Sequence, residues 1–131
     1  MMYREVLDVQ GKADSVTDVT KHVNEVIARS TIKEGLCHIF LKGTTAGLMV
    51  NENDRMLFAD FQHLMEKAAP KEKIYQHPSN GHAHLRASML HQHVSIPVSN
   101  QTMFLGKGQS VLFFEFDTER SREIVVTVLG E

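Results

Sequence analysis

The residues best suited to chemistry lie in one histidine-rich stretch, residues 77–93. It contains five of the chain's eight histidines: His77, His82, His84, His91 and His93. Neutral imidazole binds zinc and similar metals, and imidazole carries protons near neutral pH. If a helix that starts near Asn80 persists far enough, His84 and His91 share one of its faces because they are seven residues apart. The alternative is that these are surface histidines, one of them a hydrogen-bonder at a helix terminus.

A second candidate is the small-residue segment Gly43–Gly47, which Asn51 and Glu52 follow. Its hydroxyl residues, Thr44 and Thr45, can direct hydroxyls and backbone amides toward an anion at a junction between two strands. A simple tight turn is the alternative. The segment lacks the lysine-serine ending of a phosphate-binding P-loop, which excludes nucleotide binding by that route.

Isolated charged side chains give weaker candidates. The carboxylates that can act as bases or ligands are Glu52, Asp60 and Glu115. Taken singly, each is predicted to face solvent, although a carboxylate inside an apolar strand is otherwise paired in a site. Arg120 and Arg122 flank a predicted turn and either hold a phosphate in a bidentate way or are ordinary exposed arginines. The remaining histidines are assigned to structure: His22, His38 and His63.

These residues must be positioned by one domain that spans residues 1–131. A helix over 15–30 is predicted to begin with a Ser15–Asp18 capping box, a second over 57–68 to end at Pro70, and a third to begin at Asn80 and run through Leu90. Strands are predicted at residues 2–9, 35–41, 45–51, 94–98, 103–105, 111–116 and 124–129. Adjacent strands at this spacing favour hairpins, so the expected class is α+β. We expect a mainly antiparallel, sandwich-like sheet with two to three helices packed on it.

Composition excludes several classes of protein. The net charge is -2 and no stretch is strongly basic, so a nucleic-acid interface is not predicted. No apolar run approaches the roughly 18 residues of a membrane span, and the N-terminus lacks the pattern of a signal peptide. The single cysteine, Cys37, excludes an internal disulfide framework and a thiolate-rich zinc site. We therefore expect a cytoplasmic protein with no membrane and no nucleic-acid partner.

Taken in order, these motifs resemble those of the YjbQ-like family, whose members are often described as secondary thiamine-phosphate synthases. Residues 44–52 resemble the family's H-T-T-A-x-x-x-x-N-E motif, Asp60 matches the aspartate of the helix that follows, and residues 75–77 match Y-x-H. Residues 80–89 are similar to N-x-x-A-H-[LI]-K-x-S, residues 105–109 to L-G-T-W-Q, and residues 115–122 to E-x-D-x-x-R-x-R. The resemblance covers nearly the whole chain.

The resemblance implies an antiparallel α+β fold, a compact homotrimer and a polar pocket in which three histidines converge. Matched by position, His77 and His84 are two of these histidines, and Glu52 is the nearby carboxylate. These three are the expected catalytic residues. The expected ligands of a small phosphorylated molecule or anion are polar and basic: Thr44, Thr45, Asn51, Gln109, Arg86 and Arg120.

The chain departs from the family pattern at the third histidine, which opens H-T-T-A in the family and is Gly43 here. Two protein ligands bind a metal weakly, because stable zinc sites have three or four. Our hypothesis is that a nearby histidine supplies a replacement ligand: His82, His91 or His93. The expected metal ligands are then His77, His84 and His91, and zinc is the favoured divalent metal.

Two functions follow from these expectations. The first is weak thiamine-phosphate synthase activity, in which a thiazole phosphate attacks a pyrimidine methylene while pyrophosphate departs. That chemistry needs cationic help for the leaving group and a proton carrier, for which His77 or His84 is suited. The cations available are Lys42, Lys107, Arg86, Arg120 and Arg122. The alternative is a non-catalytic trimer that binds a metal or small anion and has lost the family histidine at Gly43; phosphate-ester hydrolysis is a third, weaker option.

Overall fold

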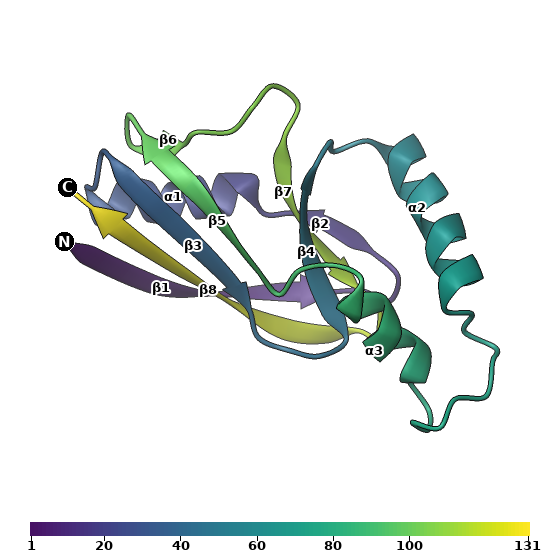
Figure 1. The fold of residues 1–131 in the computed structure, drawn as a ribbon. Helices are drawn as coiled ribbons and strands as arrows, with labels where there is room; N and C mark the ends of the chain where they lie inside the picture. Colours follow the sequence, from purple (N-terminus) through teal and green to yellow (C-terminus); the bar gives the residue numbers. More distant parts are fainter.

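Two antiparallel sheets form the frame of the molecule, and the computed structural model describes all 131 residues (Figure 1). The larger sheet has the order β1-β8-β3-β5-β6, and the smaller one has the order β2-β7-β4. The larger sheet comprises β1 (Met2–Gly11), β8 (Arg120–Gly130), β3 (Gly35–Leu41), β5 (His93–Ser99) and β6 (Thr102–Met103). The smaller sheet comprises β2 (Val16–Asp18), β7 (Ser110–Glu115) and β4 (Ala46–Asn51). All strand pairs are antiparallel, which confirms the predicted α+β class.

The main apolar core lies where helix α1 (Thr20–Ser30) and one face of the smaller sheet meet the larger sheet. Val23, Val26 and Ile27 recur at helical spacing and are fully buried in this core. In β7, Val111 and Phe113 join the same cluster, because alternate side chains of a strand share a face. The period of each element therefore determines which residues reach the core.

A second apolar cluster covers the opposite face of the smaller sheet. The intervening side chains of β7, Leu112 and Phe114, pack there with helices α2 (Arg55–Ala68) and α3 (Gly81–Ser88). The rings of Phe61 and Phe114 meet edge to face, with centroids 4.9 Å apart. Figure 1 shows both helices on the side of the smaller sheet that faces away from the larger one. No helix is long and apolar enough to cross a membrane.

The predicted start of the first helix is wrong. Residues 16–18 form β2, which pairs with β7, and α1 begins only at Thr20. The Ser15 hydroxyl donates to the Lys12 carbonyl at 2.5 Å instead of capping a helix. The Asp18 carboxylate accepts the Thr20 N–H at 2.9 Å. Pairing with the open edge of β7 satisfies the backbone of this segment, so a strand forms where local spacing favours a helix.

The interior between the two sheets contains one buried ion pair. Glu115 follows Val111 and Phe113 at alternate positions of β7, so its carboxylate points inward, where it accepts from Arg122 Nε at 2.8 Å and from Nη2 at 2.5 Å. Gly11 provides the space, since a β-carbon there would lie 2.6 Å from Glu115 Oε1. Glu115 is 0% exposed, so the prediction that it faces solvent is wrong. Arg122 is 6% exposed, which rules out the alternative that it is an ordinary exposed arginine. Bidentate pairing makes their burial possible.

Replacement of Glu115 by leucine should leave a buried guanidinium without its counter-charge. We expect Glu115→Leu to lower the free energy of unfolding by about 3–5 kcal/mol in urea denaturation. The matched control is Glu123→Leu, because Glu123 is half exposed and its ion pair with Lys42 is worth about 0–1 kcal/mol. Equal losses in the two variants would show that the buried pair does not hold the sheets together.

Candidate functional site

The side chains of His77 and His84 meet beside α3. Their ring centroids are 4.5 Å apart, and the ring planes stand at 87° to each other. The loop before α3 folds back, because the Tyr75 hydroxyl donates to the Pro70 carbonyl at 2.5 Å. Gly81 permits this fold, since a β-carbon there would lie 2.6 Å from the β-carbon of Tyr75. His77 is exposed and His84 is half-buried, so the structure brings together two of the predicted residues at an accessible place.

The start of α3 is attached to the β7–β8 connection through the carboxylate of Asp117, whose side chain is only 8% exposed. The Asn80 amide donates to Asp117 at 2.9 Å, and the Arg120 guanidinium lies 3.3 Å from the same carboxylate. Burial raises the pKa of Asp117, but the Asn80 hydrogen bond, the Thr118 backbone N–H and the Arg120 charge outweigh it, so the pKa lies below its usual value. Asn80 begins the helix as predicted, yet its side chain binds Asp117 and does not cap the helix.

The predicted hydroxyl residues lie at the same end of the smaller sheet. The start of β4 lies beside α3 (Figure 1), and a β-carbon on Gly47 would come within 2.7 Å of the Leu90 β-carbon. Thr45 is buried, and its hydroxyl accepts a hydrogen bond from Arg122 Nη2 at 2.7 Å. Thr44 is exposed. The two threonines and the two histidines therefore belong to one end of the molecule.

The other predicted ligands lie at the far end of β4. Asn51 and Glu52 line a cavity of about 340 Å³ together with Lys107 and Gln109. The six residues of β4 separate this cavity from Thr45, a span of about 20 Å for an extended strand. Figure 1 shows the loop before β7 at the opposite end of β4 from α3. Within one chain, the structure does not bring Glu52 together with the histidine pair.

Two further histidine-segment residues, His82 and Arg86, are buried on α3. The Arg86 guanidinium donates to the Ala69 carbonyl at 3.0 Å and to Glu66 at 2.7 Å, so protein groups already occupy these donors. Burial, followed by the positive charges of Arg86 and Lys71, lowers the pKa of His82. His82 is therefore uncharged at neutral pH.

The donor set for a metal is incomplete in this chain. No group of three or more His, Cys, Asp or Glu side chains is placed to hold a metal ion. Helix α3 ends at Ser88, so His91 and His84 do not share a helical face. The backbone of His91 instead exchanges hydrogen bonds with Leu48, and its side chain lines a separate cavity of about 430 Å³ with His93. Two imidazoles alone do not fit a closed zinc site.

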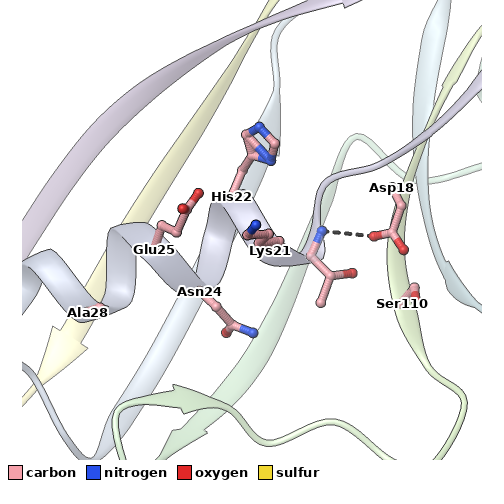
Figure 2. A pocket seen from close by; sticks show the side chains of 8 residues that line it. Asp18, Lys21, His22, Asn24, Glu25, Ala28 and Ser110 are labelled. Carbon is pink, nitrogen blue, oxygen red and sulfur yellow. Dashed lines mark hydrogen bonds between the residues drawn. The ribbon is translucent and has the colours of Figure 1, made fainter.

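A further cavity of about 730 Å³ lies at the start of α1, and none of the predicted site residues lines it. Figure 2 shows Lys21, His22 and Glu25 on α1 and the carboxylate of Asp18, which accepts the Thr20 N–H. Burial raises the pKa of Asp18, but hydrogen bonds from Thr20 and other partners outweigh it and lower the pKa. The Asp18 carboxylate holds the turn that leads into α1, so its lowered pKa is explained by a structural role.

Sequence reasoning does not find the network that joins Glu115, Asp117 and Arg122 below the histidine pair. The backbone N–H of Asp117 donates to Glu115 Oε2 at 3.1 Å, which links this ion pair to the Asp117 carboxylate that holds α3. A signal exists in the sequence, because a carboxylate flanked by the large apolar side chains of β7 must be either exposed or paired. The partner is not identifiable from spacing alone.

Comparisons with known proteins agree on one family. The family described as UPF0047 protein YjbQ-like matches residues 5–131. A UPF0047 protein of Archaeoglobus fulgidus is 36% identical over 121 residues, which cover 90% of this chain and 94% of the relative. A UPF0047 protein of Methanothermobacter thermautotrophicus is 35% identical over 117 residues, which cover 87% of this chain and 82% of the relative.

Solved structures agree with the sequence relatives. The crystal structure of a YbjQ-like protein of unknown function from Sulfolobus solfataricus superimposes with a TM-score of 0.89 at 29% identity and covers 100% of both chains. An uncharacterised yjbq/upf0047 protein of Clostridium acetobutylicum gives a TM-score of 0.90 at 30% identity, covering 95% and 99%.

The buried, uncharged His82 predicts a loss of stability in mild acid. Because its pKa is lower in the folded than in the unfolded chain, the unfolded state binds more protons below pH ~6.5, and protonation then favours unfolding. We expect the melting temperature to fall between about pH 7.5 and about pH 5.5, and His82→Gln to flatten this fall. His22→Gln, at an exposed position of α1, should keep the wild-type slope. An unchanged slope in the His82 variant would contradict the assignment.

Proposed function

The chain belongs to the UPF0047 protein YjbQ-like family, and from this premise we propose that it binds a small phosphorylated molecule beside His77 and His84. The observation that carries the proposal is the 4.5 Å contact between the two imidazole rings. No buried side-chain nitrogen of the protein lacks a hydrogen-bond partner, so the unpartnered nitrogens of these rings reach solvent. Imidazole N–H groups donate to phosphate oxygens, and a protonated imidazole adds positive charge.

A basic cavity beside His77 supports a phosphorylated ligand. Its volume is about 320 Å³, and Lys71, Lys73, Tyr75 and Ser79 contribute to its lining. This volume falls at the lower end of the roughly 300–1,000 Å³ range of small-molecule sites. Lys73 Nζ lies 5.6 Å from the centroid of the Tyr75 ring, which places that cation over an aromatic face. The charge and size of the cavity favour a small anion.

The arrangement supports binding better than turnover. Departure of pyrophosphate requires positive charge that becomes available to the leaving group. Four of the five cations expected for this role are instead engaged by carboxylates: Lys42 by Glu123, Arg86 by Glu66, Arg120 by Asp117 and Arg122 by Glu115. The fifth, Lys107, lies with Glu52 at the far end of β4. The imidazole expected at position 43 is missing. We therefore place the non-catalytic function ahead of thiamine-phosphate synthase activity, and zinc binding here would need a third ligand from outside this chain.

Assembly as a homotrimer is part of the proposal, and the outer face of the larger sheet supports self-association. Residues paired in register share a face, and two rows that are apolar except for His93 cross four strands there. The rows are Val6, Val125, Phe40 and His93, and Met2, Leu129, Leu36 and Pro97. They flank a polar row of Arg4, Thr127, His38 and Ser95. Several members are large and exposed, for example Phe40 at 40% and Val6 at 50%. Exposed apolar side chains gathered on one face in this way are typical of an interaction site.

The binding proposal predicts that loss of either imidazole weakens the affinity for phosphate. We expect inorganic phosphate to bind the wild-type protein in isothermal titration calorimetry, and His77→Ala and His84→Ala each to weaken binding about tenfold, because hydrogen bonds to a charged group are lost. His22→Ala is the matched control, since it removes an exposed histidine on α1 and should leave the affinity unchanged. Equal affinity in all four proteins would contradict the proposal.

The same proteins also test for turnover. With a thiazole phosphate and a pyrimidine diphosphate as precursors, we expect no thiamine phosphate above a protein-free control. Formation of product that depends on His77 and His84 would overturn the non-catalytic assignment and establish the transferase.

The assembly proposal predicts the mass of a trimer in sedimentation equilibrium. Phe40→Asp introduces a charge in the centre of the apolar row and should dissociate the assembly while the circular dichroism spectrum stays unchanged. Lys33→Asp, at an exposed position just before β3, is the control and should remain trimeric. A monomeric wild-type protein would contradict the proposal.

A further inference from the structure

The Arg122 guanidinium is buried, but not all of its nitrogens donate hydrogen bonds within the chain. Its Nε donates to Glu115, and its Nη2 donates to Glu115 and Thr45. Nη1 has no partner in the chain, and since no buried side-chain nitrogen is left without one, Nη1 must reach solvent. A guanidinium that is 6% exposed therefore presents one free NH₂ group to the outside.

Gly43 creates the opening at this nitrogen. A β-carbon at position 43 would lie 2.6 Å from Arg122 Nη1, closer than non-bonded atoms approach. The backbone of Gly43 has φ 139°, a conformation that favours glycine. Any other residue here would carry its side chain into the space in front of Nη1.

The backbone of the same loop offers further donors. The N–H groups of Gly43, Thr44 and Thr45 donate to no acceptor in the chain, whereas the Lys42 N–H before them binds the Glu123 carbonyl at 3.0 Å. Thr45 is 3% exposed. Gly43 and Thr44 are exposed, so their N–H groups face solvent, whereas the Thr45 N–H belongs to a buried residue. Backbone N–H groups at buried positions are nearly always partnered, so a free donor at Thr45 next to a free guanidinium nitrogen indicates a missing acceptor.

We propose that Arg122 Nη1 and the Gly43–Thr45 backbone form an oxyanion subsite that takes the phosphoryl group of the ligand. The subsite rests on the proposed function and specifies how its ligand is held. Its free guanidinium nitrogen and free backbone N–H groups suit a tetrahedral oxyanion. Glu115 and Thr45 hold the guanidinium in place, which lowers the entropy lost when a ligand binds.

The charge at the subsite is compatible with reversible binding. Glu115 neutralises Arg122, and Asp117 neutralises Arg120, so the ligand gains hydrogen bonds from fixed donors without meeting a strong excess of positive charge. Arg122 Nη1 is exposed because position 43 carries no side chain. A larger residue there would close the subsite.

The test uses inorganic phosphate with the full chain in calorimetry. Gly43→Ala should weaken phosphate binding at least about tenfold, because the added β-carbon covers Nη1 and removes a charge-assisted hydrogen bond. Arg29→Gln is the control, since Arg29 is an exposed arginine paired with Glu5 on the larger sheet and its loss should not change the affinity. Thermal melts of each variant check that it is folded.

A second measurement does not depend on the folding of Gly43→Ala. In ¹⁵N-labelled wild-type protein, the Nε–H resonance of Arg122 should shift on titration with phosphate, while that of Arg29 stays in place. No shift of the Arg122 signal under conditions where calorimetry detects binding would overturn the subsite.

The outcomes separate the subsite from the proposed function. If the histidine variants lose affinity while Gly43→Ala does not, the histidine site stands and the subsite is overturned. If only Gly43→Ala loses affinity, the subsite stands and the role of His77 and His84 is overturned. If wild-type protein does not bind phosphate, both are overturned, and parallel losses support both.

Discussion

A buried carboxylate and a buried guanidinium connect the two sheets, and the geometry of the candidate site follows from that pair. Glu115 comes from the smaller sheet and Arg122 from the larger one, and their two hydrogen bonds cross the interior between them. Burial of two charges is costly unless each finds its partner, so the strands that carry them cannot slide relative to each other. Two residues beyond Glu115, Asp117 holds the start of α3 through Asn80. The position of the histidine pair is thus fixed by the same short segment that fixes the core.

Where local pattern and tertiary packing agree, the sequence predicts the structure closely. Val23, Val26 and Ile27 lie on one face of α1 because helical spacing and burial demand the same arrangement. Packing overrides local pattern at Ser15–Asp18. The capping-box spacing there suggests a helix, but residues 16–18 pair with the edge of β7 and form a strand. The same competition ends α3 early, since hydrogen bonds to Leu48 draw the backbone at His91 into an extended path. Strand pairing between distant segments has no signature in either local sequence.

The candidate site shows a similar division between motif and geometry. The resemblance to the family motifs singles out His77 and His84 from the histidine-rich stretch, and the structure places their rings in contact. Spacing gives no warning that Glu52 lies at the other end of β4, because a motif that spans a whole strand necessarily spreads its first and last residues along its length. The motif order along the chain is informative about family, but only the direction of each strand determines which motif residues meet. Glu115 illustrates the opposite error, since its isolated position within an apolar strand suggested exposure and in fact marked a buried partner.

The glycine at position 43 changes what this end of the molecule can bind. An imidazole there would offer a lone pair to a metal ion, whereas the open position presents the Arg122 guanidinium and backbone N–H groups, which only donate. Without that imidazole the position loses a metal ligand and keeps N–H donors, which favour an anion. Because Arg122 is held by Glu115 for structural reasons, its free nitrogen is available without any rearrangement of the core. In the proposed subsite, the constraint that joins the sheets therefore also positions a donor for the ligand, so stability and binding would depend on the same side chain.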